Sequence, residues 1–282
     1  MHWLFALLGL LAEPAHAQTF PPELATNNIV WTSQSKNAGE SMPCGGGDVG
    51  LNVWVEHGEL YCYVARSGAF DENNTLLKLG RLRVHLSPNP FAGTEFRQEL
   101  HLENGSVTIT GTNGKLRAQA TVWVDVFRPI IHLEITGNQP TTAEVNYETW
   151  RHADRRTLGK ENNQNSYKWA PQGAVTTFRD SVQFEGSGVA FYHQNRPQSV
   201  FDVAVQQQGL AAVKTQLFNP LQNLIFGGVL QGRHLAPAGT YSGSYLGTPF
   251  KGWKLRSQAP ARTHAMVLAL HTETTATAQQ WQ

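Results

Sequence analysis

The sequence predicts an all-β protein, and three features support that prediction. Short segments alternate apolar with polar residues, which is the period of a strand buried on one face. Gly, Asn and Pro recur between these segments, and charged residues make up only 15% of the 282-residue chain, a balance typical of β-rich extracellular proteins. No stretch before residue 276 has a sustained helical period. We therefore expect a large antiparallel β-sandwich (a super-sandwich), with a helix beginning only at the C-terminus.

The first residues, 1–17, resemble a signal peptide. An apolar run from Trp3 to Ala12 precedes Ala15-His16-Ala17, which has the small-x-small form of a cleavage site. The run is too short to span a bilayer. We expect the mature chain to be secreted or periplasmic, with no membrane span after signal cleavage and a sandwich domain over residues 18–274.

A glycine-rich segment follows. Residues 41–55 read SMPCGGGDVGLNVWV, in which Gly45, Gly47 and Gly50 fit the spacing G-x-G-x-x-G. A dinucleotide-binding turn of that form needs a strand before it and a helix after it. Here a strand follows and none is expected before it. The glycines are therefore interpreted as a tight turn that leads into a sheet, and no cofactor is expected.

The remaining chain reads as strands joined by short turns. His57-Gly58, Asn104-Gly105 and Asn113-Gly114 have the composition of hairpin turns. The expected strands cover residues 51–55, 59–64, 81–88, 95–105, 106–111, 115–127, 130–137, 143–150, 174–180, 189–195, 201–208, 224–230 and 263–272. Many short strands joined by hairpin turns predict an antiparallel arrangement packed as a large β-sandwich.

Two segments depart from the strand pattern. Residues 150–172 form a long polar stretch bounded by Trp150 and Trp169, and a loop of this length inside a compact domain is usually functional or disordered. Residues 275–282 look like the first turn of a helix, with Thr275 or Thr277 as its cap. We interpret this turn as the start of a linker, and the chain as a fragment of a longer protein.

The residues that could carry catalysis form no recognisable motif. The sequence has no HExxH, CxxC or G-x-S-x-G, and its basic residues are scattered over a net charge of +1. No metal ligand and no nucleic-acid partner is therefore expected. Glycoside hydrolysis needs two carboxyl groups that face each other. The carboxylates in or beside loops are Asp71, Glu72, Glu95, Glu99, Glu148 and Asp154, each with solvated surface charge as the alternative, and we name no catalytic residue.

Sugar binding needs an exposed aromatic face beside fixed hydrogen-bonding groups. Trp150, Arg151 and Trp169 of the long polar stretch meet that description best, and Asp71 lies in the next-best polar loop. Packing in the core is the alternative for each tryptophan.

The two cysteines, Cys44 and Cys62, allow a disulfide in an oxidising compartment. If His57-Gly58 closes a two-residue hairpin, Cys62 lies opposite Val53, well along the strand from Cys44. Two unpaired thiols remain the alternative.

Several long runs resemble a known group of proteins. The run from Ile29 to Phe91, together with FRQELHLENGSVTI (96–109) and NYETWR (146–151), is similar to the N-terminal β-sandwich of exported bacterial glycoside-hydrolase-like proteins of undefined function. It looks like a relative of the N-terminal domain in family-95-type α-L-fucosidases. The family turn, P-x-G-N-G, here has Gly46 in place of Asn, which puts in doubt any polar role for that position but not the turn.

The resemblance implies a non-catalytic domain. In such proteins a helical linker and an (α/α)6 barrel with the catalytic carboxylates follow the sandwich, so the expected partners are carbohydrate and that C-terminal barrel. The sandwich would support the barrel and line part of its substrate cleft. The alternatives are a stand-alone carbohydrate-binding module and a plain scaffold that uses the sandwich only for contacts.

Overall fold

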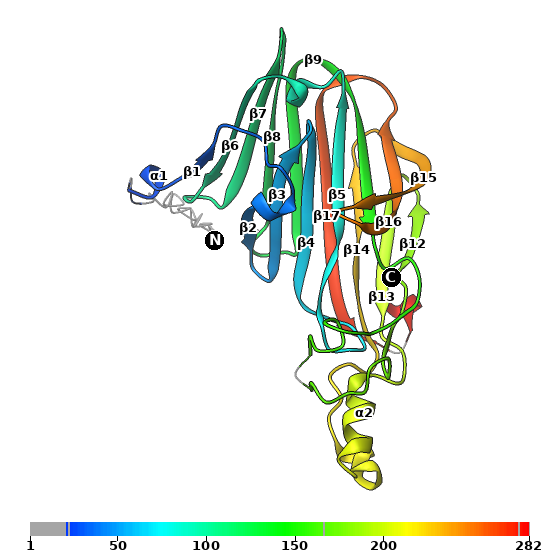
Figure 1. Ribbon diagram of the computed structural model, residues 1–282. Helices are drawn as coiled ribbons and strands as arrows, with labels where there is room; N and C mark the ends of the chain where they lie inside the picture. The colour runs from blue at the N-terminus through cyan, green and yellow to red at the C-terminus, as the bar shows by residue number, and fades with distance from the viewer. Residues whose placement is uncertain (1–20, 22, 166, 276, 282) are drawn as a thin grey trace, which may run out of the picture.

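The computed structural model describes residues 21, 23–165, 167–275 and 277–281 (Figure 1). The signal peptide expected over residues 1–17 lies outside this range. All strand pairs within it are antiparallel. Fifteen strands build two sheets that share one long strand, and β10 and β11 form a separate two-stranded sheet. The prediction of a mostly β, antiparallel sandwich is confirmed.

Sheet A contains the longer row of strands. In spatial order it runs β1 (Ile29–Trp31), β6 (Glu95–His101), β7 (Ser106–Asn113), β8 (Leu116–Val124), the first part of β9 (Ile130–Thr149), β17 (Ala261–Thr274), β14 (Leu224–Gly232), β13 (Gly188–Gln194) and β12 (Ser181–Glu185).

Sheet B packs against sheet A. It runs β2 (Met42–Gly46), β3 (Val49–Glu56), β4 (Glu59–Phe70), β5 (Leu76–Ser87), the second part of β9, β16 (Thr248–Ser257) and β15 (Leu235–Tyr245). Strand β9 changes sheets: up to Thr141 it pairs with β8 and β17, and from Thr142 it pairs with β5 and β16. The 130–137 and 143–150 strands expected from the sequence are therefore one continuous strand.

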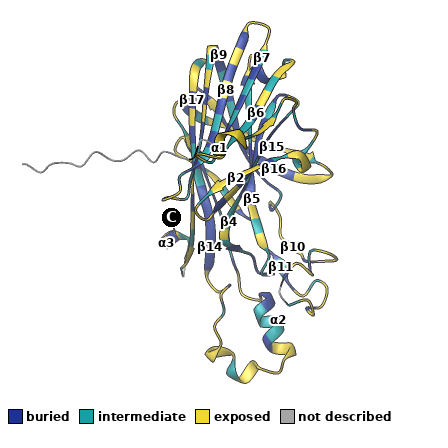
Figure 2. Ribbon diagram, turned by 90° about the vertical axis from the view of Figure 1, so that its left-hand side faces the viewer, coloured by how far each residue is buried: buried dark blue, intermediate teal, exposed yellow. Residues whose placement is uncertain are grey.

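The core lies between the two sheets. Alternate residues of each inner strand point into it, such as Leu60, Cys62 and Val64 of β4, which are at most 2% exposed. One cluster of buried apolar side chains joins these residues to strands of sheet A, including β8 and β17. In Figure 2, buried residues (dark blue) recur along the strands. On the strands of sheet B, the residues between these inward-pointing ones point outward. They form the face that carries the candidate site.

The glycine-rich segment forms a hairpin rather than a nucleotide-binding turn. Residues 42–46 are strand β2, paired with β3 from Met42↔Val53 to Gly46↔Val49. A strand thus does precede the glycines, contrary to the expectation, but a strand also follows them, so no helix N-terminus faces the turn. Gly47 has φ +59°, a conformation that a glycine adopts without strain.

The expectation that helix begins only at the C-terminus is wrong. Residues 201–208, expected as a strand, lie in helix α2 (Val200–Gln207) and the residue after it. The alternation of Phe201, Val203 and Val205 suggested a strand, but two local features favour a helix. Ser199 precedes the first turn, and its backbone N–H donates to the Asp202 carboxylate at 2.8 Å, a capping-box contact.

The other helical elements are short. They are α1 (Glu23–Thr26), the 3-10 turns η1 (Ala38–Glu40), η2 (Pro90–Ala92) and η3 (Ala211–Gln216), and α3 (Ala278–Trp281). In α3, the N–H of Gln280 donates to the Thr277 hydroxyl at 3.3 Å. Of the two caps expected from the sequence, Thr275 and Thr277, it is therefore Thr277 that caps the terminal helix. The Trp281 side chain is 9% exposed and packs near Tyr192 of sheet A.

The described residues of the long polar stretch pack with α2 at one end of the sandwich. It contributes β10 (Arg155–Arg156), which pairs with β11 (Thr176–Thr177); only these two residues of the strand expected over 174–180 are extended in a sheet. A small second core gathers Ala170, Val175, Val200 and Leu221. Figures 1 and 2 both show α2 and its connections projecting beyond the ends of the strands.

Candidate functional site

The outer face of sheet B is rich in aromatic rings. Because side chains alternate along a strand, Tyr61 and Tyr63 of β4 point away from the core that receives Leu60 and Cys62. Trp54 of β3 lies beside both rings, with centroids 5.0 Å from Tyr61 and 4.9 Å from Tyr63. Trp54 is nevertheless 0% exposed, so another element must cover it.

The β15–β16 hairpin provides that cover. Tyr245, at the end of β15, has its ring centroid 6.3 Å from that of Trp54, although β15 and β3 lie near opposite ends of the strand order in sheet B. Its hydroxyl donates to Glu56 and accepts the N–H of Ala38, both at 2.8 Å. These contacts show that the hairpin tip folds back across the outer face of the sheet and is tied to β3 and η1.

Arg81 lies beneath the hairpin, where aromatic rings surround it. Its guanidinium carbon is 4.2 Å from the centroid of Tyr245 and 5.0 Å from those of Tyr61 and Phe250. A cation over ring faces is stabilised by their quadrupoles, more strongly when water is excluded. Arg81 is only 4% exposed.

A single carboxylate neutralises Arg81. The Arg81 Nε donates to Glu148 Oε2 at 2.6 Å, and a second guanidinium nitrogen completes the ion pair. The Tyr241 hydroxyl donates to the other oxygen of Glu148, and Arg83 lies 3.9 Å from that oxygen. Burial and the nearby Glu148 charge raise the pKa of Tyr241 well above its usual value. Glu148 is 0% exposed and is fully occupied by these partners.

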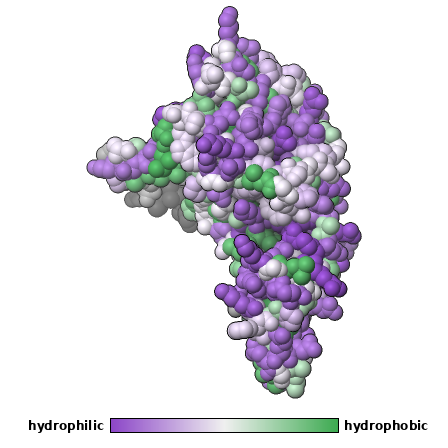
Figure 3. All heavy atoms as spheres, in the orientation of Figure 1, coloured by the Kyte–Doolittle hydropathy of each residue, from purple (hydrophilic) through white to green (hydrophobic). Residues whose placement is uncertain are grey.

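An open cleft of about 410 Å³ lies between the hairpin tip and the sheet. Its lining residues are Tyr63, Lys78, Arg81, Glu148, Trp150, Tyr245, Leu246, Thr248 and Phe250. Figure 3, in the orientation of Figure 1, shows hydrophobic patches among hydrophilic residues on this face. We call this space the sheet-B cleft.

The sheet-B cleft continues in two directions. Tyr63 and Lys78 also line a hollow of about 250 Å³ beside the β2–β3 hairpin. Trp150 and Thr248 also line a hollow of about 230 Å³ that extends to Arg155 in the long polar stretch. We call these three adjoining hollows the groove, with the sheet-B cleft in its centre and Trp150 at one junction.

Of the four residues expected to bind sugar, Trp150 and Arg151 line the same hollow beside the sheet-B cleft, but Trp169 and Asp71 do not join them. Trp150 lines the sheet-B cleft and is half-buried, with its ring edge-on to Tyr63 at 5.9 Å. Trp169 is 81% exposed, on the long polar stretch. Arg151 and Asp71 are 5% and 2% exposed and are held in buried polar contacts. The sequence did not identify four residues that line the cleft: Tyr63, Lys78, Tyr245 and Phe250. For Tyr63, the alternation in YCY (61–63) could have indicated a ring on the outer face of the sheet.

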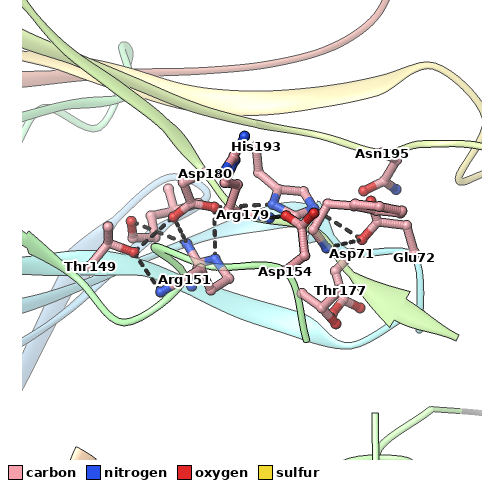
Figure 4. A network of polar contacts seen from close by, with 12 residues as sticks. Asp71, Glu72, Thr149, Arg151, Asp154, Thr177, Arg179, Asp180, His193 and Asn195 are labelled. Carbon is pink, nitrogen blue, oxygen red and sulfur yellow. Dashed lines mark hydrogen bonds and ion pairs between the residues drawn. The ribbon is translucent and has the colours of Figure 1, made fainter. Parts of the chain in front are cut away.

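Arg151 belongs to a buried chain of charges, shown in Figure 4. Its Nε donates to Asp180 at 2.9 Å, and His193 donates from Nδ1 to Asp180 at 3.1 Å and from Nε2 to Glu72 at 3.2 Å. Thr149 donates to the second oxygen of Asp180 at 2.8 Å. We call Glu72, His193, Asp180 and Arg151 the buried network. It ties β13 and the turn after β4 to the long polar stretch.

The pKa values in the buried network follow from its charges. Burial alone would lower the pKa of His193, but its hydrogen bonds to Asp180 and Glu72 outweigh burial and raise it to about 9. Burial alone would raise the pKa of Asp180, but the Arg151 charge and the His193 bond lower it overall. His193 is therefore an imidazolium at neutral pH, which is why both of its ring nitrogens donate.

Asp71 has a structural role next to this network. Its carboxylate accepts the N–H groups of Asn73 and Thr75 at 3.0 and 2.9 Å and the hydroxyl of Thr177 at 2.8 Å. These bonds close the turn between β4 and β5 and link it to β11. Burial raises the pKa of Asp71. Arg151 lines the hollow beside the sheet-B cleft, but its guanidinium is bound to Asp180 and to the backbone carbonyl of Lys78.

The remaining candidate carboxylates are dispersed. Glu95 and Glu99 lie on β6 of sheet A, where Glu99 pairs with Arg97 at 2.7 Å. Asp154 lines the hollow next to the sheet-B cleft and accepts the N–H of Arg179 at 3.0 Å. Among the described residues that line the sheet-B cleft, Glu148 is the lone carboxylate.

The cysteines are free thiols. Cys44 of β2 pairs with Leu51 and Cys62 of β4 pairs with Val53, so strand β3 lies between them and a disulfide, which needs Cα atoms within about 7 Å, does not form. The register Val53↔Cys62 is the one the sequence predicts. Burial raises the pKa of Cys44 to about 12.

The described residues contain neither a metal-binding cluster nor a membrane-spanning helix. Within the described ranges, no group of three or more His, Cys, Asp or Glu side chains is placed to hold a metal ion. The described helices include none with the length and apolar character needed to cross a membrane.

The fold and the site define an antiparallel β-sandwich with an aromatic-lined groove on the outer face of one sheet. The chain belongs to the family described as "Domain of unknown function (DUF5703)", whose N-terminal profile matches residues 30–282.

No curated protein matches the sequence. Among solved structures, the chain is similar to one described as "Putative kojibiose phosphorylase from human microbiome", at 9% sequence identity and a TM-score of 0.40. That match covers 90% of this chain and 33% of the other, so the chain spans about a third of that protein's length.

Proposed function

We propose that this chain is the non-catalytic β-sandwich domain of a secreted glycoside-hydrolase-like protein, and that it contacts carbohydrate through the sheet-B cleft. In this proposal it supports a C-terminal (α/α)6 barrel that carries the catalytic residues. The observation that carries the proposal is the cleft itself, a groove lined by aromatic rings whose one carboxylate is locked in an ion pair.

The aromatic lining suits a sugar. The C–H faces of a pyranose pack on aromatic rings, while polar groups at the rim fix its hydroxyls. The half-buried rings of Tyr63, Trp150 and Tyr245 line the cleft beside the exposed Thr248 hydroxyl. Open hollows adjoin the cleft on both sides, an arrangement that suits a chain of sugars rather than one enclosed ring.

The state of Glu148 supports a non-catalytic role. Hydrolysis of a glycosidic bond uses an acid and a base or nucleophile about 5 to 10 Å apart, both able to reach the bond. Glu148 is 0% exposed and pairs with Arg81, so it can neither donate nor accept a proton at a sugar in the cleft. The runs that resemble glycoside-hydrolase-like proteins support the placement of catalysis in a separate barrel.

The test of this proposal is an activity and binding assay on the 282-residue chain. We expect no release of sugar from fucosides or other glycosides. Affinity electrophoresis in gels containing neutral and acidic polysaccharides should retard the chain, and Trp150→Ala should abolish the retardation. The matched control is Trp169→Ala, an exposed tryptophan outside the groove, which should migrate like the parent chain. Hydrolysis that Glu148→Gln abolishes would contradict the non-catalytic role.

A stand-alone carbohydrate-binding module is the second candidate. One observation favours it: the groove is complete within residues 43–250 and needs no other chain to form its walls. The two candidates differ in what the longer protein does. If the reading frame continues into a helical barrel whose hydrolytic activity falls when the sandwich is removed, the supporting role holds. Full activity of the barrel without the sandwich would favour the module.

A further inference from the structure

We propose that the sheet-B cleft selects an acidic saccharide, with one carboxylate or sulfate ester of the sugar bound at the Lys78 ammonium and the ring packed against Trp150. This inference rests on the proposed function, because it specifies the class of sugar that the same cleft takes. It is carried by the balance of charges in the cleft.

Lys78 is the uncompensated charge in this site. It lies near the start of β5, pairs with Ala65 across a register shift, and is exposed. Its ammonium is 4.1 Å from the centroid of Tyr63. Within the described part of the chain it makes no ion pair and donates no side-chain hydrogen bond. Desolvation by the surrounding protein lowers the pKa of Lys78. A bound anion would stabilise the charged ammonium, because it supplies the counter-charge that the protein does not.

The other charges of the cleft cancel each other. Arg81 and Glu148 form the buried ion pair described above. Arg83, on the same strand, has Glu59 as its near partner at 3.0 Å. A neutral sugar would therefore leave Lys78 without a counter-charge, whereas a sugar with one negative charge makes the occupied cleft neutral.

The position of Lys78 suits a polymer that presents an acid on each sugar. Lys78 and Tyr63 line both the sheet-B cleft and the hollow beside the β2–β3 hairpin, while Trp150 lies at the opposite junction. A sugar ring on Trp150 and an acid group at Lys78 would thus occupy the central part of the groove. Neighbouring sugars would extend into the two flanking hollows.

The test uses pairs of polysaccharides in which the same sugar backbone is present in a charged and a neutral form. Binding of the 282-residue chain is measured by isothermal titration with polygalacturonate and its fully methyl-esterified form, and with dextran sulfate and dextran. We expect the charged member of a pair to bind at least about tenfold more tightly than its neutral partner, with affinity that falls as salt is raised. The pair that shows the difference identifies carboxylate or sulfate as the bound group.

Three variants assign the effect to Lys78. Lys78→Met should remove the preference for the charged polymer, and Lys78→Arg should retain most of it. Lys251→Met is the matched control, because Lys251 also lies over a ring of sheet B, Trp253 at 5.1 Å, makes no ion pair among the described residues, and lies outside the groove. It should bind like the parent chain. Circular dichroism checks that each variant is folded. If Lys78→Met is not folded, the inference is tested by Lys78→Arg and by the parent chain with the charged and neutral polymers.

The outcomes separate the two proposals. Equal binding of charged and neutral polymers, lost in Trp150→Ala, would overturn the acidic-saccharide inference and leave the proposed function intact. Binding of no polymer would overturn both. A charge preference that survives Lys78→Met but is lost in Lys251→Met would place the acid group elsewhere and overturn the assignment to Lys78.

Discussion

Trp150 and Arg151 are neighbours in the sequence but belong to regions that use charge in opposite ways. Trp150 lines the sheet-B cleft, whereas Arg151 lies in the buried network with Asp180, His193 and Glu72. In the network each charge has an opposite partner within about 3 Å. In the cleft, Arg81 is paired but Lys78 is not. The difference indicates that the network stabilises the fold, and the unpaired Lys78 is the feature on which the proposed binding of an acidic saccharide rests.

A buried ion network is costly to break because each remaining charge stays desolvated. An exposed lysine keeps most of its contact with water, so leaving it unpaired costs less than breaking a buried pair. The comparison therefore makes opposite predictions for substitutions in the two regions.

The largest effect is expected for Asp180→Asn. This change leaves Arg151 and His193 without their shared carboxylate, and breaking such a buried pair lowers the free energy of unfolding by about 3 to 5 kcal/mol. Urea denaturation followed by fluorescence measures it. The control is Asp48→Asn, which removes an ion pair to Arg66 from a carboxylate that is 45% exposed and should change stability by less than about 1 kcal/mol. Equal effects for the two variants would remove the distinction between the regions.

The next effect is a pH dependence of stability from His193. Its pKa is raised to about 9 in the folded chain, above the ordinary value of about 6.5. The stabilisation is therefore fully present below about pH 6.5 and is lost as the pH rises through about 9, by up to about 3 kcal/mol.

Denaturation curves at several pH values between 6 and 9.5 check this, with His193→Gln expected to flatten the slope. His85, whose pKa is raised by its hydrogen bond to Glu59 and lowered in part by burial, is half-exposed and contributes less. A slope that His85→Gln removes and His193→Gln leaves would contradict the role of the buried network.

A small effect on stability is expected for Lys78→Met. No ion pair is lost, because Lys78 has none among the described residues, so the free energy of unfolding should change by no more than about 0.5 kcal/mol. The same denaturation assay measures it. A loss comparable to that of Asp180→Asn would show that Lys78 has a structural partner and would weaken its assignment to a ligand.

The smallest effect is expected from reducing agent. Because Cys44 and Cys62 are free and β3 separates them, a reductant should leave the melting temperature unchanged. Two thiols should react with a thiol reagent in denaturant and much more slowly in the folded chain, since burial raises their pKa values. A drop in melting temperature on reduction would indicate a disulfide.

Much of the sheet structure could be predicted from the sequence because it depends on local alternation. The register Val53↔Cys62 followed from the His57-Gly58 turn alone. Helix α2 could not be predicted in this way, since its apolar residues also fit a strand. Its capping by Ser199 and Asp202 and the packing of Val200 decide the outcome.

The candidate site was harder to predict because it depends on distant residues. Trp150 was identified from its loop, but its neighbours Tyr63 and Tyr245 are brought together by a hairpin that folds over the sheet. Arg151 looked like a ligand-binding residue because its partner Asp180 lies 29 positions away. No local pattern reports either contact.

The most direct test of the account is a crystal structure of the chain soaked with an acidic oligosaccharide, such as trigalacturonate. The account predicts a sugar in the groove, with its ring on Trp150 and a carboxylate within about 3 Å of the Lys78 ammonium. A sugar bound at Trp169 or on sheet A, with the groove empty at saturating ligand, would contradict it.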